Sequence, residues 1–120
     1  MNKVIRSFGA AFSGIGFAIR TQSHMRVHVG AAVAVCGLGF IVELKPLEWT
    51  VILLAITVVM SAEMMNTAIE QVVDLASPGI HPLAKLAKDT AAGAVLIAAI
   101  LSIVIGLLIL GPPLWRMLFQ

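Results

Sequence analysis

The sequence predicts an all-α integral membrane protein, with an N-terminal surface helix and three membrane-spanning helices in one domain, residues 1–120. Of these 120 residues, 60% are hydrophobic and only 12% are charged, whereas a soluble domain carries about a quarter of its residues as charged groups. Two long segments, Trp49–Ala62 and Thr90–Leu110, contain no charged residue at all. A net charge of only +2 gives no reason to expect a nucleic-acid partner.

The first element, about residues 2–22, is predicted to be an amphipathic helix lying in the membrane interface. Its apolar residues recur at intervals of three and four, which is the spacing of one face of a helix. Basic residues stand near both ends of the segment, as interfacial helices require. A cleaved signal peptide is not expected in this segment, because arginine and histidine follow the apolar stretch too soon. The apolar residues of this face are Ile5, Phe8, Phe12, Ile15 and Ile19.

The spans are predicted at about residues 26–43, 48–75 and 90–110. A bilayer core needs about 20 apolar residues of helix, so the third span is clear and the first is slightly short. The second segment is long enough to be a span only if its helix continues beyond the hydrocarbon core of the bilayer, through Asp74.

Prolines and glycines mark the ends of these spans. Pro46 cannot continue the first span but is well tolerated at the start of the second. The triplet 77–79, Ser-Pro-Gly, opens a loop after the second span. Pro82 is expected to start a short helical turn before the third span, and the Gly-Pro-Pro triplet at 111–113 to end that span.

The distribution of basic residues predicts the orientation. Six lysines and arginines lie in the N-terminal segment and in the 76–89 loop, and only Lys45 and Arg116 lie on the other side. By the positive-inside rule, the N-terminus faces the cytoplasm and the C-terminus faces outward. Residues His24, Arg26 and His28 are interpreted as a basic patch at the membrane interface, with Arg26 placed to pair with a phosphate.

Small residues are frequent in the first and third spans, and they let helices pack closely in lipid. Three helices are few for enclosing polar groups at membrane depth. We therefore expect a homo-oligomer, in which helices of one protomer cover the polar groups of its neighbour. The lone cysteine, Cys36, allows no disulfide and no cysteine metal site.

The second span contains an acidic stripe, defined here as Glu63, Asn66, Glu70 and Asp74. These residues are three, four and four positions apart, so at about 100° per residue they fall within roughly 80° of each other on one helix face. Ionisable groups at membrane depth are costly and usually functional. Four polar residues in one row therefore indicate a functional site rather than a set of interhelical hydrogen bonds.

The residue types favour phosphoryl transfer with a divalent metal. Carboxylates such as Glu70 supply the hard oxygen ligands that Mg²⁺ prefers, and Mg²⁺ takes its remaining ligands from water and phosphates. Lys88 would neutralise phosphate charge, and Glu63 is best placed as the base for an accepting hydroxyl. No phosphate-binding glycine loop of the Walker or Rossmann type is present.

Two stretches carry a resemblance to a known family. They are Glu63-Met-Met-Asn66-Thr-Ala-Ile-Glu70-Gln-Val-Val-Asp74 and His81-Pro-Leu-Ala-Lys-Leu-Ala-Lys88-Asp89-Thr-Ala-Ala-Gly-Ala-Val. Together they closely resemble the signature of the small bacterial membrane lipid kinases, the prokaryotic diacylglycerol and undecaprenol kinases. The similarity runs from about Lys3 to Ile100.

The resemblance implies a homotrimer with shared active sites in the bacterial inner membrane, which uses MgATP to phosphorylate a lipid hydroxyl at the cytoplasmic interface. It implies that Glu63 is the catalytic base and Asn66 its partner, that Glu70 is a metal ligand, and that four further residues bind the nucleotide. These nucleotide-binding residues are Asp74, His81, Lys88 and Asp89.

One position departs from the family pattern. The family commonly has a second metal-binding glutamate between the surface helix and the first span, and this chain has Gln22 there. Glutamine offers a carbonyl oxygen to a metal but no charge, which puts the usual two-metal arrangement in doubt.

Three segments, Phe8–Ile15, His24–His28 and His81–Asp89, resemble the undecaprenol kinase branch more than the diacylglycerol branch. Undecaprenol is therefore the expected acceptor and diacylglycerol the alternative. Two other classes of protein remain open from the residues alone. In a cation or proton channel, the acidic stripe would line a shared pore, which leaves Lys88 and Asp89 without a role. In a holin-type pore protein, the ordered acids would be unexplained.

Overall fold

The computed structural model describes residues 2–120, and these residues form four helices and no strand. Helix α1 spans Lys3–Thr21, α2 spans Ser23–Ile41, α3 spans Pro46–Ala76 and α4 spans Pro82–Phe119. Helices α2, α3 and α4 are each long enough and apolar enough to cross a membrane. The predicted fold class, an amphipathic helix followed by three spans, is confirmed.

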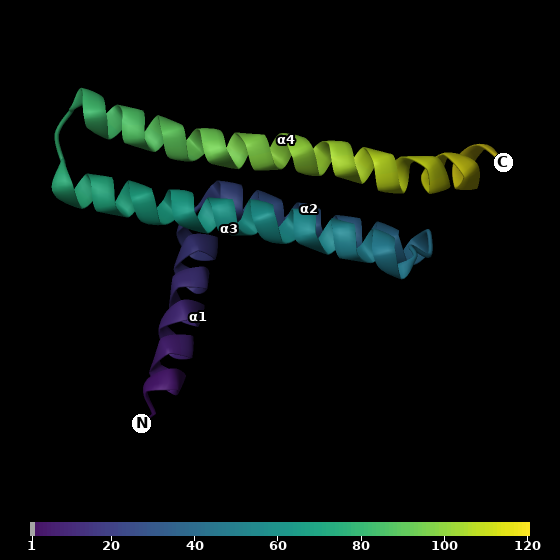
Figure 1. The fold of residues 1–120 in the computed structure, drawn as a ribbon, viewed down its shortest axis with the longest axis horizontal. Coiled ribbons are helices and arrows are strands. Elements are labelled where there is room, and N and C mark those ends of the chain that lie inside the picture. The colour runs from purple at the N-terminus through teal and green to yellow at the C-terminus, as the bar shows by residue number, and fades with distance from the viewer. Residues whose placement is uncertain (1) are drawn as a thin grey trace.

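Helices α3 and α4 run antiparallel and side by side, with α2 alongside α3 (Figure 1). Small residues line the contact between α3 and α4: Ala55 and Ala98 are buried, and the hydroxyl of Ser102 donates a hydrogen bond of 3.3 Å to the carbonyl oxygen of Ala55. Small side chains permit this close approach of two helix backbones.

Helix α1 leaves this bundle sideways, roughly perpendicular to the three long helices (Figure 1). Arg26, in the first turn of α2, fixes the turn between α1 and α2. Its guanidinium donates to the carbonyl oxygens of Ile19 at 3.0 Å and Arg20 at 2.8 Å. Carbonyls in the last turn of a helix have no partner within the helix. One nitrogen of the guanidinium is therefore used as a cap for α1. That Arg26 also pairs with a phosphate stays a prediction.

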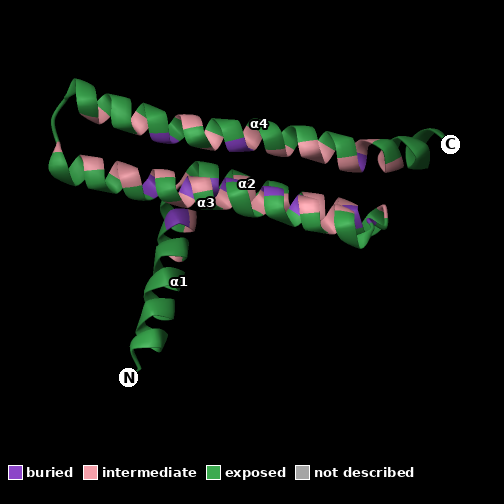
Figure 2. Cartoon of the chain, in the orientation of Figure 1, coloured by how far each residue is buried: buried purple, intermediate pink, exposed green. Residues whose placement is uncertain are grey.

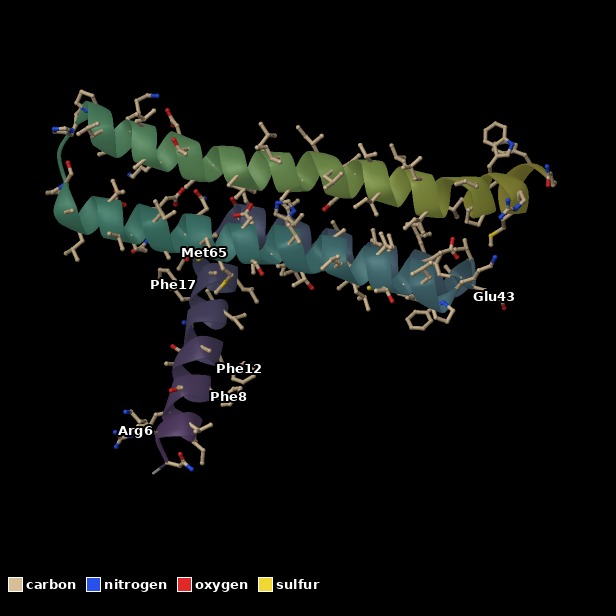
Figure 3. The ribbon with its side chains drawn as sticks, viewed as in Figure 1. Arg6, Phe8, Phe12, Phe17, Glu43 and Met65 are labelled. Carbon is tan, nitrogen blue, oxygen red and sulfur yellow. The ribbon has the colours of Figure 1, made fainter. Side chains whose placement is uncertain are left out.

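The two faces of α1 differ in chemistry. Phe8 and Phe12 point toward the side on which α2 extends, and Arg6 points toward the opposite side (Figure 3). Almost all of α1 is exposed within the single chain (Figure 2), including these two aromatic rings. A helix with an apolar face turned toward the spans and a basic face turned away suits the plane of a membrane interface.

The long helices differ in length, and the difference positions the acidic stripe. At about 1.5 Å per residue, α2 is about 28 Å long, close to the thickness of a hydrocarbon core, whereas α3 and α4 are about 46 and 57 Å long. One end of α3 and α4, joined by the 77–81 loop, extends beyond α1 (Figure 1). Residues near this loop therefore lie outside the layer that α2 spans.

At the opposite end, α2 and α3 are joined by a tight turn. Glu43 has a positive φ of 57°, and the amide of Leu44 bonds to the carbonyl oxygen of Gly39 at 3.1 Å. The ring of Trp49 packs against Gly39 so closely that an added Cβ would lie 2.7 Å from the ring. Beside this turn lies a small apolar core of Leu44, Ile52 and Leu110.

The prediction that the triplet at 111–113 ends the third span is wrong, because α4 continues through Pro112 and Pro113 to Phe119. Proline removes backbone donors but is tolerated in membrane helices where neighbouring helices support the backbone. Here Leu114 packs against the apolar core, and Trp115 stacks on Phe119 with ring centroids 4.4 Å apart. The expected separate turn at Pro82 is likewise part of the same continuous α4.

Candidate functional site

The acidic stripe lies on the half of α3 that leads to the 77–81 loop, and its burial decreases along the helix. Glu63 is buried, with 4% of its surface exposed. Asn66 and Glu70 are half-buried, and Asp74 is exposed. The stripe thus begins inside the helix bundle and ends at its surface. This gradient suits a site at which a membrane-embedded substrate meets a water-soluble one.

Glu63 is paired with a residue of a different helix. The Nε2 atom of His28 in α2 lies 3.1 Å from Oε1 of Glu63, and the two side chains are 22% and 5% exposed. The interpretation of His28 as part of an interfacial basic patch is therefore wrong. His28 lies in the second turn of α2, and only the packing of α2 on α3 brings it to Glu63.

Asn66 and Glu70 form a second pair one turn further along. The Nδ2 atom of Asn66 donates to Oε1 of Glu70 at 3.2 Å. The other amide atom, Oδ1 of Asn66, is buried and has no hydrogen-bond partner within residues 2–120. Buried polar atoms are nearly always partnered, so this oxygen is an exception that calls for a partner from outside the single chain. Nearby, the hydroxyl of Thr67 donates to the carbonyl oxygen of Glu63 at 2.9 Å.

Lys88 joins α4 to the exposed end of the stripe. Its Nζ atom lies 2.5 Å from Oδ1 of Asp74, and both side chains are partly accessible. Lys88 precedes Thr90, where the charge-free part of α4 begins. The hydrogen bond to Asp74 raises the pKa of Lys88 above its ordinary value, and the negative charge of Glu70 adds to this effect. The structure therefore brings Lys88 and the stripe together.

Two other predicted nucleotide-binding residues have local partners instead. Asp89 accepts a hydrogen bond of 2.6 Å from Lys85 on the exposed face of α4. The Nδ1 atom of His81 accepts from the backbone amide of Leu83 at 3.1 Å and so caps the start of α4. Neither Asp89 nor His81 forms a hydrogen bond or ion pair with the stripe in the part of the chain that the structure describes.

Gln22 lies between α1 and α2, where it is the N-terminal cap residue of α2. Its Nε2 atom lies 3.4 Å from the hydroxyl oxygen of Thr21, and within residues 2–120 its side chain forms no hydrogen bond with Glu70. Across residues 2–120, no three histidine, cysteine or acidic side chains are grouped closely enough to hold a metal ion. The oxygens that this chain offers together are those of Glu70 and the free Oδ1 of Asn66.

An apolar groove of about 540 Å³ runs between α2, α3 and α4. Its lining extends from Val27 and His28 at the start of α2 to Leu114 near the end of α4. Among the described residues of the lining, His28 is the one ionisable group. The groove therefore meets the acidic stripe at the His28–Glu63 pair.

Comparison with known proteins assigns this arrangement of residues to a family. Residues 9–110 match the model for prokaryotic diacylglycerol kinase. The chain is 48% identical over 114 residues to an undecaprenol kinase of Bacillus subtilis (strain 168), covering 95% of this chain and 93% of the relative. It is 43% identical over 109 residues to a diacylglycerol kinase of Synechocystis, covering 90% of this chain and 62% of that relative. A diacylglycerol kinase of Escherichia coli (strain K12) is 26% identical over 102 residues, which cover 85% of this chain and 84% of the relative.

Proposed function

The chain belongs to the prokaryotic diacylglycerol kinase family, and on this premise we propose that it transfers the γ-phosphoryl group of ATP to the hydroxyl of undecaprenol. Kinases of this family are phosphotransferases with an alcohol acceptor, so this chain is a membrane lipid kinase that uses ATP as co-substrate. The channel and holin-type alternatives have no support among its relatives.

The observation that carries the catalytic assignment is the buried carboxylate of Glu63. It lies at the membrane-embedded end of the acidic stripe, beside His28 and next to the apolar groove. A lipid hydroxyl held at this level is within reach of a protein base but not of bulk water. We assign Glu63 as the general base that takes the proton of the acceptor hydroxyl.

The oxygens of Asn66 and Glu70 fit a hard divalent cation. The free Oδ1 of Asn66 and the carboxylate of Glu70 are neighbouring oxygen donors on one helix face. Few protein ligands are needed, because Mg²⁺ keeps several waters and phosphate oxygens. Glu70 with Asn66 would hold Mg²⁺, which supplies charge stabilisation to the transferring phosphoryl group. Gln22 stands where the family commonly has a second metal-binding glutamate, and we propose that it offers the metal a neutral carbonyl oxygen instead.

The nucleotide is proposed to lie along the exposed half of the stripe. The ammonium group of Lys88 is available to phosphate oxygens at the point where it now contacts Asp74. His81, the residue that caps the start of α4, and Asp89, further along that helix, are proposed to contact the rest of the nucleotide. Positioning and charge neutralisation are the main contributions that a protein makes to phosphoryl transfer.

We propose that the 77–81 loop and the N-terminus face the cytoplasm and that the C-terminus lies outside the bacterial inner membrane. The excess of basic residues on the loop side supports this orientation. The basic face of α1, which points toward the loop side of the molecule, supports it as well (Figure 3). ATP, which is cytoplasmic, would then reach the stripe directly.

The working unit is proposed to be a homotrimer with shared active sites. Two features support association: large apolar side chains are exposed along all three long helices, and Asp74 at the end of the stripe stays exposed although Lys88 of α4 contacts it. Neighbouring protomers would cover both features.

The test is a kinase assay on purified protein in mixed micelles. We expect ATP consumption that depends on undecaprenol, with diacylglycerol a poorer acceptor at equal mole fraction. Equal or better turnover of diacylglycerol would overturn the choice of acceptor. ATP consumption without any lipid alcohol, or none with either lipid, would overturn the assignment as a lipid kinase.

A further inference from the structure

The pair formed by His28 and Glu63 points to a second residue that the reaction depends on. Resting on the proposed function, we propose that His28 is a positioning residue, which donates a hydrogen bond from Nε2 to Oε1 of Glu63 and so leaves Oε2 to accept the proton of the lipid hydroxyl. His28 would not touch the reacting atoms, and its effect would pass through Glu63.

The geometry of the pair supports this role. The two atoms are 3.1 Å apart, and they come from different helices, α2 and α3. The carboxylate of Glu63 is almost completely buried, and His28 is its one side-chain partner within residues 2–120. A buried carboxylate without a donor is strongly disfavoured. The orientation of this carboxylate therefore depends on the position of the imidazole.

The pair is also the one direct polar contact between side chains of α2 and α3 in the described chain. Without it, nothing but apolar packing would fix the rotation of the Glu63 side chain. General-base catalysis requires the accepting oxygen to lie within hydrogen-bond reach of the proton. A misplacement of about 1 Å can lower a rate roughly a hundredfold.

The location of His28 adds a second argument. His28 lines the apolar groove and Glu63 does not, so the imidazole borders the groove and also contacts the carboxylate. A purely apolar residue at position 28 would extend the groove to the carboxylate and remove its donor. A histidine here both bounds the groove and supplies the N–H group that the acid needs.

The proton balance of the proposed step involves Glu63 and not His28. The O–H bond of the lipid alcohol breaks, and its proton moves to Oε2 of Glu63. The electron pair left on the lipid oxygen forms the new bond to the γ-phosphorus, while the bond from that phosphorus to the bridging oxygen of ADP breaks. His28 keeps its Nε2 proton throughout, which distinguishes a positioning residue from a second base.

The competing interpretation is that His28 only ties α2 to α3. Three substitutions of His28 distinguish the two roles. For each variant, kcat, the KM of ATP and the thermal stability are measured. His28→Gln keeps a donor near the position of Nε2, His28→Asn places its donor closer to the backbone, and His28→Leu has no donor. His24→Leu, one turn earlier on an exposed position of α2, is the matched control.

For a positioning residue, we expect His28→Leu and His28→Asn to lower kcat roughly tenfold to hundredfold with little change in the KM of ATP. His28→Gln should recover most of kcat, and His24→Leu should behave as wild type. Wild-type kcat in His28→Leu, or equal kcat in the glutamine and asparagine variants, would overturn the inference and leave the proposed function intact.

A thermal-unfolding cycle tests the contact itself without any assay of turnover. The variants are His28→Leu, Glu63→Leu and the double substitution, because leucine at either position removes one partner of the contact. We expect the effects on the unfolding midpoint to be non-additive, as they are for residues in contact. Additive midpoints would overturn the pairing. A wild-type protein that phosphorylates no lipid alcohol would instead overturn the proposed function, and with it the role of His28.

Discussion

The ammonium nitrogen of Lys88 lies 2.5 Å from the carboxylate of Asp74, and this ion pair joins α4 to α3 beside the 77–81 loop. Asp74 is the last residue of the acidic stripe, about 16 Å along α3 from Glu63 by helix rise. The proposed base and the proposed phosphate-binding cation are therefore at opposite ends of one stripe. A nucleotide bound between them would present one end to the membrane-embedded acid.

The first prediction concerns the cation of this pair. Lys88→Met should raise the KM of ATP by about tenfold or more, because a charge-assisted hydrogen bond to phosphate is lost. The unfolding midpoint should change little, since exposed ion pairs contribute little to stability. Steady-state kinetics at varied ATP concentration measures the effect.

Lys85→Met is the matched control for that measurement. Lys85 has the same charge, lies one turn away on α4 and pairs with Asp89 rather than with the stripe. We expect a much smaller change in the KM of ATP. If both substitutions raise the KM equally, the effect comes from the general positive charge of the loop region, and the assignment of Lys88 is wrong.

The second prediction concerns the base. Glu63→Gln should lower kcat by about two to four orders of magnitude, the usual contribution of a general base. The protein should keep its oligomeric state in mild detergent, because glutamine keeps the size of the side chain and an oxygen for His28. Glu48→Gln, at the other end of α3, keeps its bond to the Lys45 amide and is the control. Near-wild-type turnover in Glu63→Gln would refute the base assignment.

The third prediction concerns the metal. Glu70→Gln should raise the Mg²⁺ concentration that gives half-maximal activity by about tenfold or more, since the charged oxygen ligand is lost. Gln22→Glu should lower that concentration if Gln22 faces the same cation. Gln71→Glu adds the same charge beside the stripe but on an exposed position outside it. An equal gain from both glutamates would indicate a general electrostatic effect and remove Gln22 from the metal site.

Local sequence features were sufficient to predict most of this fold. The spacing of Ile5, Phe8 and Phe12 predicted the surface helix, and the charge-free stretches predicted α2 and α3, each to within a few residues, because hydropathy and helical period are local properties. Helix α4 was predicted too short at both ends. The end of α4 was missed, because the backbone there is supported by Leu114 and the Trp115–Phe119 stack, which are contacts that a proline rule does not include.

The grouping of residues at the candidate site was also predicted in part. Periodicity alone placed Asn66 and Glu70 on one face, and the structure joins them by a hydrogen bond. His28 was missed, because its pairing with Glu63 depends on how α2 packs on α3, which no local pattern encodes. The roles of all the predicted site residues stay predictions, and those of Gln22 and His81 have the least geometric support, since the contacts of both are local to their own helix ends.

The last prediction concerns the turn that joins α2 to α3. Gly39→Ala should lower the thermal stability of the protein, because the new Cβ would lie 2.7 and 2.9 Å from two ring atoms of Trp49. Trp49 also packs against Phe40 in a tilted arrangement with ring centroids 4.9 Å apart, and moving its ring away from Gly39 would disturb this contact. Overpacking of this kind costs about 1–3 kcal/mol.

Gly37→Ala, whose Cβ would meet nothing within 4 Å, is the control and should be neutral or slightly stabilising in mid-helix. Thermal unfolding in detergent measures both variants. An unchanged midpoint in Gly39→Ala would mean that Trp49 is not held against α2 as the structure has it, whereas equal losses in both variants would indicate a general sensitivity of α2.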